Sequence, residues 1–370
     1  MTHINYKIII SFLGLTSIMN GLFMWATIPV SIYYREQEGW QIFWAGLATV
    51  VIGVLMWFFT RNASKNIQKK EGYLIVTLGW VMLTLTGTLP YLFTQTIPHF
   101  PDAVFEAISG YSTTGASIIT DIESLPKSIL LWRSETHWIG GMGIIVLTIA
   151  ILPLLGIGGM QLFMAEAPGP SADKLHPRIT ETAKRLWLIY FSFTLTETVL
   201  LKVAGMSWYD AVNHAMATMS TGGFSTKNAS LAYWNHMPWV QYIIIAFMFV
   251  AGTNFILSYF ALKGKIQKVL RNEEFKYYFL GVVGISLLIA GLAYFFQDPN
   301  LQTSVNHPEP YGHAESILRH SIFQVVSVIT TTGFVSADFT QWNSMATVVM
   351  FSLFFLGGSA GSTSGGVKIV

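Results

Sequence analysis

The chain has 370 residues, of which 52% are hydrophobic and only 11% are charged. Soluble domains carry about 25% charged residues, so this composition indicates a polytopic membrane protein. The formal net charge of +2 argues against a nucleic-acid partner, and a cysteine count of zero excludes disulfides, thiol nucleophiles and thiolate metal sites.

Eight segments are apolar enough and long enough to cross a bilayer as helices, which takes about 20 predominantly apolar residues each. They are 8–32, 41–60, 72–94, 135–163, 186–205, 239–262, 274–296 and 345 to the end. No Ala-x-Ala-like cleavage site follows the first, so we interpret it as a retained span and not as a signal peptide. The sequence therefore predicts an all-α polytopic membrane protein.

Three shorter apolar segments lie between these spans, at 102–112, 210–220 and 316–330. They are too short to cross the bilayer, and broken helices are tolerated at membrane depth only where they line protein or a water-filled cavity. We expect three re-entrant half-helices, with Asp102 and Asp210 as the N-caps of the first two.

The basic residues predict the orientation of the chain. Three alternate loops, 61–71, 164–185 and 263–276, hold 13 of the 21 Lys and Arg residues. The positive-inside rule places these loops and the N-terminus in the cytoplasm. All three half-helices then enter from outside, and the partial negative charge at their C-termini favours a cation there.

Each half-helix ends in hydroxyl residues followed by a glycine, which we call the motif glycine. Gly115, Gly223 and Gly333 lie 108 and 110 residues apart. Glycine enters the left-handed region cheaply, and cation filters are built from rings of backbone carbonyls. One Thr-Thr-Gly alone would be typical of helix packing, whereas three copies at constant spacing predict an ion filter. The candidate filter residues are Thr113, Thr114, Gly115, Thr221, Gly222, Gly223, Thr331, Thr332 and Gly333.

A second glycine-rich stretch interrupts the last apolar segment. It comprises Gly357, Gly358, Ser359, Ala360, Gly361, Ser362, Thr363, Ser364, Gly365 and Gly366, and we call it the 357–366 segment. Each glycine costs a helix about 1 kcal/mol relative to alanine, so we expect the helix to break here. A close helix-packing surface is the alternative, and packing is also our interpretation of the milder cluster at 140–143.

The 357–366 segment also matches the G-x-S-x-G pattern of serine hydrolases around Ser359. An intramembrane serine protease is therefore a remote alternative. It would need a base, and the membrane-region candidates are His137, His214 and His320. All three map to helix starts or to the outer leaflet, which argues against this function.

Several polar residues fall within the predicted membrane region. Glu197 lies mid-span, and an intramembrane acid is a functional hypothesis by default, with a buried hydrogen bond as the alternative. We interpret Asn20 and Asn254 as packing residues and Glu106 as a source of negative potential in an outer vestibule. Arg133 is expected to snorkel toward the interface.

The three motifs, with their spans and half-helices, resemble the Trk/Ktr/HKT superfamily of cation transporters, and within it the bacterial TrkH type. The resemblance covers almost the whole chain. It implies a potassium-channel-like fold in which repeated span–half-helix–span units surround a pseudo-fourfold pore. Two peripheral spans would occupy 1–70, and the pore repeats 71–165, 180–265 and 272–370.

The resemblance also implies the function. Plant members that transport sodium carry serine at the first filter glycine, so Gly115 points to potassium as the substrate, with rubidium also permeant. The protein would be a transporter and not an enzyme, with no cofactor and no metal beyond potassium at the filter. A potassium symporter coupled to sodium or protons, with Glu197 as the coupling group, is the alternative with the same fold.

Further expectations follow from the same resemblance. The 357–366 segment would be an intramembrane gate, controlled by a cytosolic nucleotide-binding regulatory subunit of the Trk type. The protein would be a homodimer in the bilayer of a bacterial inner membrane. A fourth filter strand is expected about 110 residues after Gly333, beyond Val370, so we expect the fourth repeat to be missing from this chain.

Overall fold

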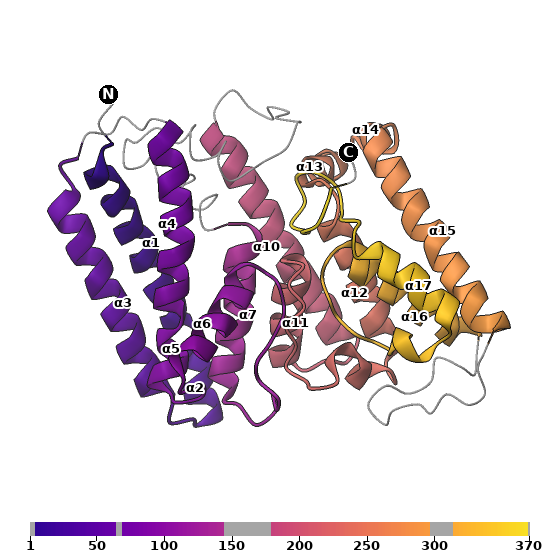
Figure 1. The fold of residues 1–370 in the computed structure, drawn as a ribbon, viewed down its shortest axis with the longest axis horizontal. Coiled ribbons are helices and arrows are strands. Elements are labelled where there is room, and N and C mark those ends of the chain that lie inside the picture. The colour runs from indigo at the N-terminus through magenta and orange to yellow at the C-terminus, as the bar shows by residue number, and fades with distance from the viewer. Residues whose placement is uncertain (1–3, 64–68, 144–178, 297–313, 369–370) are drawn as a thin grey trace. The chain divides into compact units, whose positions relative to one another are not determined.

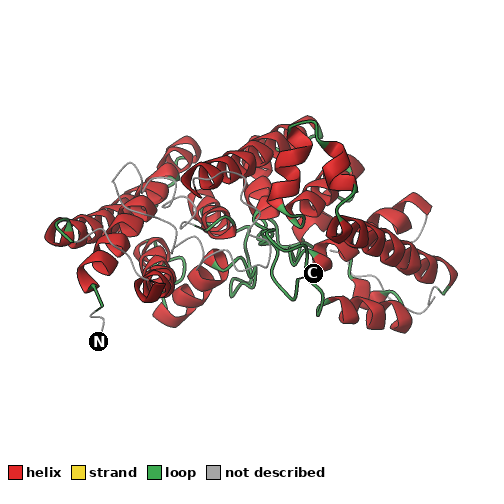
Figure 2. Cartoon of the chain, turned by 90° about the horizontal axis from the view of Figure 1, so that it is seen from above, coloured by secondary structure: helices red, strands yellow, loops and turns green. Residues whose placement is uncertain are grey.

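The computed structural model describes residues 4–63, 69–143, 179–296 and 314–368, and all of its regular elements are helices (Figures 1 and 2). The chain forms two compact units, Met1–Leu188 and Ile189–Val370. The second half of the predicted 135–163 span and most of the basic 164–185 loop lie outside the described residues.

The first unit is built on long apolar helices. Its elements are α1 (Tyr6–Ala26), α2 (Ile28–Tyr34), α3 (Gly39–Thr60), α4 (Lys69–Gly87), α5 (Leu89–Phe93), α6 (Phe100–Tyr111) and α7 (Lys127–Gly141). Helix α1 packs along both α3 and α4. A Cβ added to Gly14 would lie 2.7 Å from the carbonyl oxygen of Gly53. The two backbones therefore approach closely, as small residues allow in membrane helix pairs.

The second unit consists of α10 (Ile179–Val203, which contains the boundary), α11 (Trp208–Met219), α12 (Pro238–Ala251), α13 (Phe255–Leu262), α14 (Ile266–Leu270), α15 (Glu273–Phe295), α16 (Ala314–Ile329) and α17 (Ser344–Leu353). Two 3₁₀ turns, η2 (Ser230–Trp234) and η3 (Phe339–Gln341), follow α11 and α16. Helix α16 packs against α12 and α15, and its apolar side joins their buried residues in one core.

Five helical stretches among the described residues are long and apolar enough to cross a membrane. They are Tyr6–Tyr34, Gly39–Thr60, Lys70–Phe93, Lys184–Val203 and Glu273–Phe295. All five coincide with predicted spans. Helix α17 is too short by itself, because it ends at Leu353, before the 357–366 segment.

The prediction of one continuous span at 239–262 is wrong. Helices α12 and α13 meet at an angle of 110°, with a break at residues 252–254. Asn254 is the N-cap of α13, since its side chain accepts a hydrogen bond from the Ile256 amide at 2.9 Å. The Gly252 carbonyl, freed at the break, accepts a hydrogen bond from the Ser359 amide at 2.9 Å. Asn254 thus starts a new helix instead of packing within an old one.

The three half-helices are present as α6, α11 and α16, each beginning within two residues of its predicted start. Asp102 and Asp210 are not the N-caps, however. His99 is the N-cap of α6, and Ser207 that of α11. The Ser207 hydroxyl accepts the Asp210 amide at 3.0 Å and donates to its carboxylate at 2.7 Å. Both aspartates instead occupy the first helical turn, where their negative charge interacts favourably with the positive end of the helix dipole.

Candidate functional site

The three hydroxyl-glycine motifs share one backbone conformation. In each, a threonine and the motif glycine two residues later both have positive φ. The φ values are 53°, 54° and 55° for Thr113, Thr221 and Thr331, and 76°, 82° and 80° for Gly115, Gly223 and Gly333. A β-branched residue in this region is an outlier that persists only where its surroundings hold it. Because the same conformation recurs in three motifs, we infer that it is a structural requirement of the motif.

The half-helices end in a way that explains this conformation. The threonine amide hydrogen-bonds the carbonyl three residues earlier, and the next amide hydrogen-bonds the carbonyl five residues earlier. The first set is Thr113 to Gly110, Thr221 to Thr218 and Thr331 to Val328, at 2.9–3.1 Å. The second set is Thr114 to Ser109, Gly222 to Ala217 and Thr332 to Ser327, at 2.9–3.0 Å. This is the Schellman arrangement, so each motif caps its own half-helix.

Two of the motifs meet inside the second unit. A Cβ added to Gly223 would lie 2.0 Å from the carbonyl oxygen of Thr332, which no real side chain tolerates. At Gly333, by contrast, no atom of the described residues lies within 4 Å of an added Cβ. The close approach of the Thr332 carbonyl therefore requires glycine at 223, and glycine also takes the positive φ of this position at little cost. The structure brings Thr221–Gly223 and Thr331–Gly333 together, and Gly115 belongs to the first unit.

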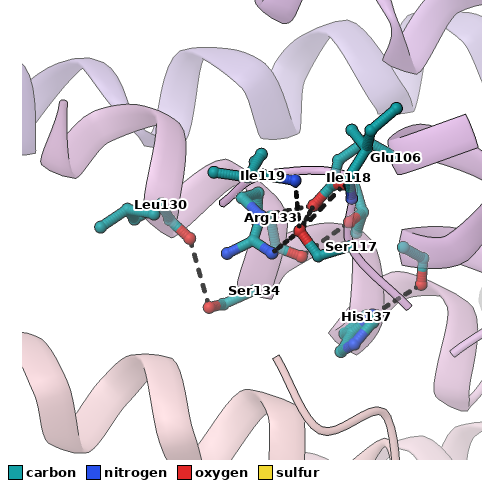
Figure 3. A network of polar contacts seen from close by, with 10 residues as sticks. Glu106, Ser117, Ile118, Ile119, Leu130, Arg133, Ser134 and His137 are labelled. Atoms are coloured by element: carbon teal, nitrogen blue, oxygen red, sulfur yellow. Dashed lines mark hydrogen bonds and ion pairs between the residues drawn. The ribbon is translucent and has the colours of Figure 1, made fainter. Parts of the chain in front are cut away.

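In the first unit a buried ion pair contacts the non-helical segment that follows Gly115 (Figure 3). We call such a segment after a motif glycine the strand, although it belongs to no β-sheet. Arg133 Nε donates to Glu106 Oε1 at 2.8 Å, and the two side chains are 1% and 0% exposed. The same carboxylate accepts hydrogen bonds from the Ser117 hydroxyl at 3.1 Å and the Ile118 amide at 3.1 Å. The prediction that Arg133 snorkels is wrong, and Glu106 is paired within the protein instead of facing a vestibule. The sequence does not reveal this pair, because its members are 27 residues apart.

The 357–366 segment is not helical and lies against the second and third motifs. The Gly365 amide donates to the Thr331 hydroxyl at 2.6 Å. The Thr363 hydroxyl lies 3.0 Å from the carbonyl oxygen of Met219, the last residue of α11, and 3.2 Å from that of Ala251. The predicted interruption of the helix is therefore present, and it contacts the candidate filter directly.

Close packing accounts for Gly140 in the other glycine cluster. A Cβ added to Gly140 would lie 1.9 Å from the carbonyl oxygen of Tyr111. Helix α7 therefore passes directly over the C-terminus of α6, and Gly140 serves packing, as predicted. Gly358 approaches the Gly252 carbonyl in the same way, at 2.7 Å from an added Cβ, so the 357–366 segment also uses glycine for close approach.

The remaining predicted residues have defined surroundings. Glu197 is fully buried beside Thr218, whose hydroxyl donates to the His214 carbonyl at 2.7 Å. Ser359 is buried, but its hydroxyl has no hydrogen-bond partner among the described residues. His214 and His320 hydrogen-bond other serines, Ser225 and Ser336.

His137 contacts the carbonyl of Gly110 through Nδ1 at 2.8 Å. The described structure thus assembles no catalytic base at Ser359. Among the described residues, no group of three or more His, Asp or Glu residues is arranged to hold a metal ion.

Comparison with known proteins identifies the family. The model of the TrkH family, described as cation transport proteins, matches residues 38–370. The Trk system potassium uptake protein TrkH of Halomonas elongata is 39% identical over 98% of this chain and 73% of its own. The protein of the same name from Escherichia coli K12 is 39% identical over 100% of this chain and 73% of its own.

The fold agrees with a solved member. The crystal structure of the potassium transporter TrkH from Vibrio parahaemolyticus superimposes with a TM-score of 0.82 and 33% identity, covering 99% of this chain and 73% of that one. The predicted all-α, potassium-channel-like fold class is confirmed, and the family is one of transporters, not enzymes. The chain therefore belongs to the TrkH family of cation transport proteins.

Proposed function

We propose that this protein takes up potassium across a bacterial inner membrane through a filter of backbone carbonyls. Three of the four filter strands are Thr113–Gly115, Thr221–Gly223 and Thr331–Gly333, from pore repeats at 71–165, 180–265 and 272–370. The observation that carries the proposal is the pair of left-handed residues repeated in all three motifs. In a filter of this kind, main-chain carbonyl oxygens replace the hydration shell of the ion. The relatives named above as potassium uptake proteins support potassium as the ion.

The C-termini of the half-helices favour a cation at the motifs. Each half-helix ends at its motif, where its partial negative charge is concentrated. The membrane potential supplies about 2.3 kcal/mol per 100 mV for each inward charge, so uptake requires no hydrolysis by this chain. The N-terminus and the basic loops are cytoplasmic in this proposal, and the motifs are entered from outside.

The 357–366 segment acts as the gate. Its direct hydrogen bonds to Thr331 and to the end of α11 support this role, because any displacement of the segment alters contacts of the candidate filter. We assign its control to a cytosolic nucleotide-binding regulatory subunit of the Trk type, and the active form to a homodimer. Both assignments rest on the resemblance to the Trk group.

A second candidate function is potassium symport coupled to sodium or protons. The observation that favours it is Glu197, a carboxyl that is 0% exposed within a spanning helix. Intramembrane acids are expensive and commonly functional. Replacing Glu197 by Gln separates the two candidates: potassium flux that stays the same at every pH and sodium concentration excludes the coupled version.

The proposal is tested by uptake of radioactive rubidium into liposomes that contain the protein expressed from its whole gene. We expect rubidium to accumulate under an inside-negative potential, with potassium as a strong competitor and sodium as a weak one. Protein-free liposomes are the control. Absence of potential-driven uptake contradicts conduction, and equal inhibition by sodium and potassium contradicts the selectivity.

A further inference from the structure

The residue nine positions before each motif glycine makes a hydrogen bond to the strand that follows the glycine. These residues are Glu106, His214 and Gln324. They differ in chemistry but share burial, at 0%, 0% and 1% exposure. Hydropathy and composition do not reveal them, because the three are different polar residues and α11 and α16 carry further polar residues.

The three contacts reach equivalent places. Glu106 accepts from the Ser117 hydroxyl at 3.1 and 3.2 Å, and Ser117 lies two residues after Gly115. His214 Nε2 lies 2.9 Å from the Ser225 hydroxyl, two residues after Gly223. Because His214 Nδ1 faces the Asp210 carbonyl at 2.8 Å, that nitrogen donates and Nε2 accepts from Ser225 in the neutral ring.

In the third motif the amide of Gln324 makes the contact. Its Nε2 donates to the carbonyl of Ala337 at 2.9 Å and lies 3.4 Å from the Ser336 hydroxyl, three residues after Gly333. The register is shifted by one residue, since Val335 occupies the position of the other two serines. The helix-to-strand connection is conserved in geometry although the side chains differ.

A second contact strengthens the support one helical turn earlier. Asp210 accepts from the Thr226 hydroxyl at 2.6 Å, and His320 Nδ1 lies 3.0 Å from the Ser336 hydroxyl. Positions four apart lie on one face of a helix, so the same face of the half-helix holds the strand twice. In the first unit Arg133 supplies the second contact, from Nη2 to the Ser117 hydroxyl at 3.1 Å.

Each candidate filter strand is thus fixed at both ends. The Schellman capping bonds hold it before the glycine, and the polar side chains hold it after the glycine. Left-handed threonine persists only where the surroundings over-determine it. A strand fixed at both ends keeps its carbonyls at one spacing, and the size of the carbonyl cavity is one of the two proposed sources of selectivity among cations.

We propose that Glu106, His214 and Gln324 are positioning residues that set the ion selectivity of the filter through the strand after each motif glycine. This inference rests on the proposed function, because it assigns a role to residues around the filter. The ion does not contact these side chains in this proposal. Glu106 acts through Ser117 and the Ile118 amide, His214 acts through Ser225, and Gln324 acts through Ser336 and the Ala337 carbonyl. Glu106, whose hydrogen bonds are charge-assisted, holds its strand most strongly.

The test removes the hydroxyls of Ser225 and Ser336 with the least change in shape. We expect Ser225→Ala and Ser336→Ala to lower the ratio of potassium to sodium inhibition of rubidium uptake by about fivefold to tenfold, the size of one lost hydrogen bond. Ser225→Thr keeps a hydroxyl and should retain most of the ratio. Ser286→Ala, which removes a buried hydroxyl from α15, is the matched control and should leave the ratio unchanged.

A role in folding alone gives a different result. It would reduce the yield, the thermal unfolding temperature or the total uptake, while the inhibition ratio of the remaining protein stays at the wild-type value. That outcome overturns the inference. A double-mutant cycle between His214→Phe and Ser225→Ala gives a second readout, since effects on the ratio that simply add would also contradict it.

Failure of the proposed function can be distinguished from failure of this inference. If the wild-type protein takes up sodium instead of rubidium, potassium uptake is wrong, but the serine variants must still change the ratio of the two ions. If it takes up neither ion, the difference in thermal unfolding temperature between potassium and sodium buffers replaces uptake. The inference then requires this difference to shrink in Ser225→Ala and Ser336→Ala, and an unchanged difference overturns it.

Discussion

At the residue scale, the motif glycines are distinguished by contact as well as by conformation. Thr221 shows that a β-branched residue can be held at positive φ in this fold, so conformation alone does not demand glycine at 223. The Thr332 carbonyl does, because it occupies the space of a Cβ. At position 223, the contact with the neighbouring motif therefore decides that the residue must be glycine.

We expect Gly223→Ala to abolish selective rubidium uptake, because its Cβ would push the Thr332 carbonyl out of place. The measurement is rubidium uptake with and without competing sodium. Gly284→Ala in α15 is the matched control, since an added Cβ there meets nothing within 4 Å and should leave uptake intact. Wild-type uptake and selectivity in Gly223→Ala would contradict the close approach.

The ion pair between Glu106 and Arg133 gives a second prediction. Arg133→Met leaves a buried carboxylate without its cation, which costs about 3–5 kcal/mol of stability. We expect a lower midpoint of thermal unfolding in detergent, with partial recovery in the double variant Glu106→Gln/Arg133→Met. Arg61→Met, at an exposed position, is the control. A midpoint equal to that of the wild type would rule out a structural role for the pair.

At the element scale, the N-terminal helix α1 is hydrogen-bonded to helices of the first predicted pore repeat. Asn20 of α1 donates to the Thr86 hydroxyl at 2.9 Å and accepts from the Tyr111 hydroxyl at 2.7 Å. Tyr111 is the last residue of α6, four residues before Gly115. Asn20 is fully buried and thus connects α1 and α4 to the end of the first half-helix.

The 357–366 segment provides the prediction at this scale. Thr363→Val keeps the shape of the side chain but removes the hydroxyl that contacts the carbonyls of Met219 and Ala251. If the segment is the gate, we expect the rate of rubidium uptake without the regulatory subunit to rise by about tenfold. The reason is that the position in which the segment blocks the pore loses one hydrogen bond.

Ser352→Ala in α17 serves as the control for Thr363→Val, since among the described residues its hydroxyl bonds to the Val348 carbonyl of its own helix. A lower uptake rate in Thr363→Val, at equal protein yield, contradicts a blocking role for the segment.

The elements that the sequence predicts well are those with a local cause. The half-helices follow from segment length and from the glycine at the end of each. The bend between α12 and α13 was missed because 239–262 is apolar throughout, and hydropathy does not register the Gly-Thr-Asn at 252–254. The pair of Glu106 and Arg133, and the contacts of His214 and Gln324, depend on tertiary packing between separate elements, which a periodic pattern does not contain.

At the scale of the whole molecule, the prediction concerns orientation in the membrane. The chain contains no cysteine, so a single introduced cysteine reports its own side of the bilayer. We expect Asn228→Cys to react with an impermeant maleimide in intact cells, and Lys265→Cys to react only after permeabilisation. Both positions are exposed. The reverse pattern would invert the topology derived from the positive-inside rule.

One hydroxyl joins the two parts of the candidate pore. Thr331 contributes its main chain to the third motif and its side chain to the Gly365 amide. Coupling between two sites is reciprocal in free energy. If movement of the 357–366 segment changes how tightly a cation is held, then an occupied filter must equally change how readily the segment moves. Under that condition the protein responds to the ion that it transports, and the external concentration of the ion is one of the factors that determine how often the gate opens.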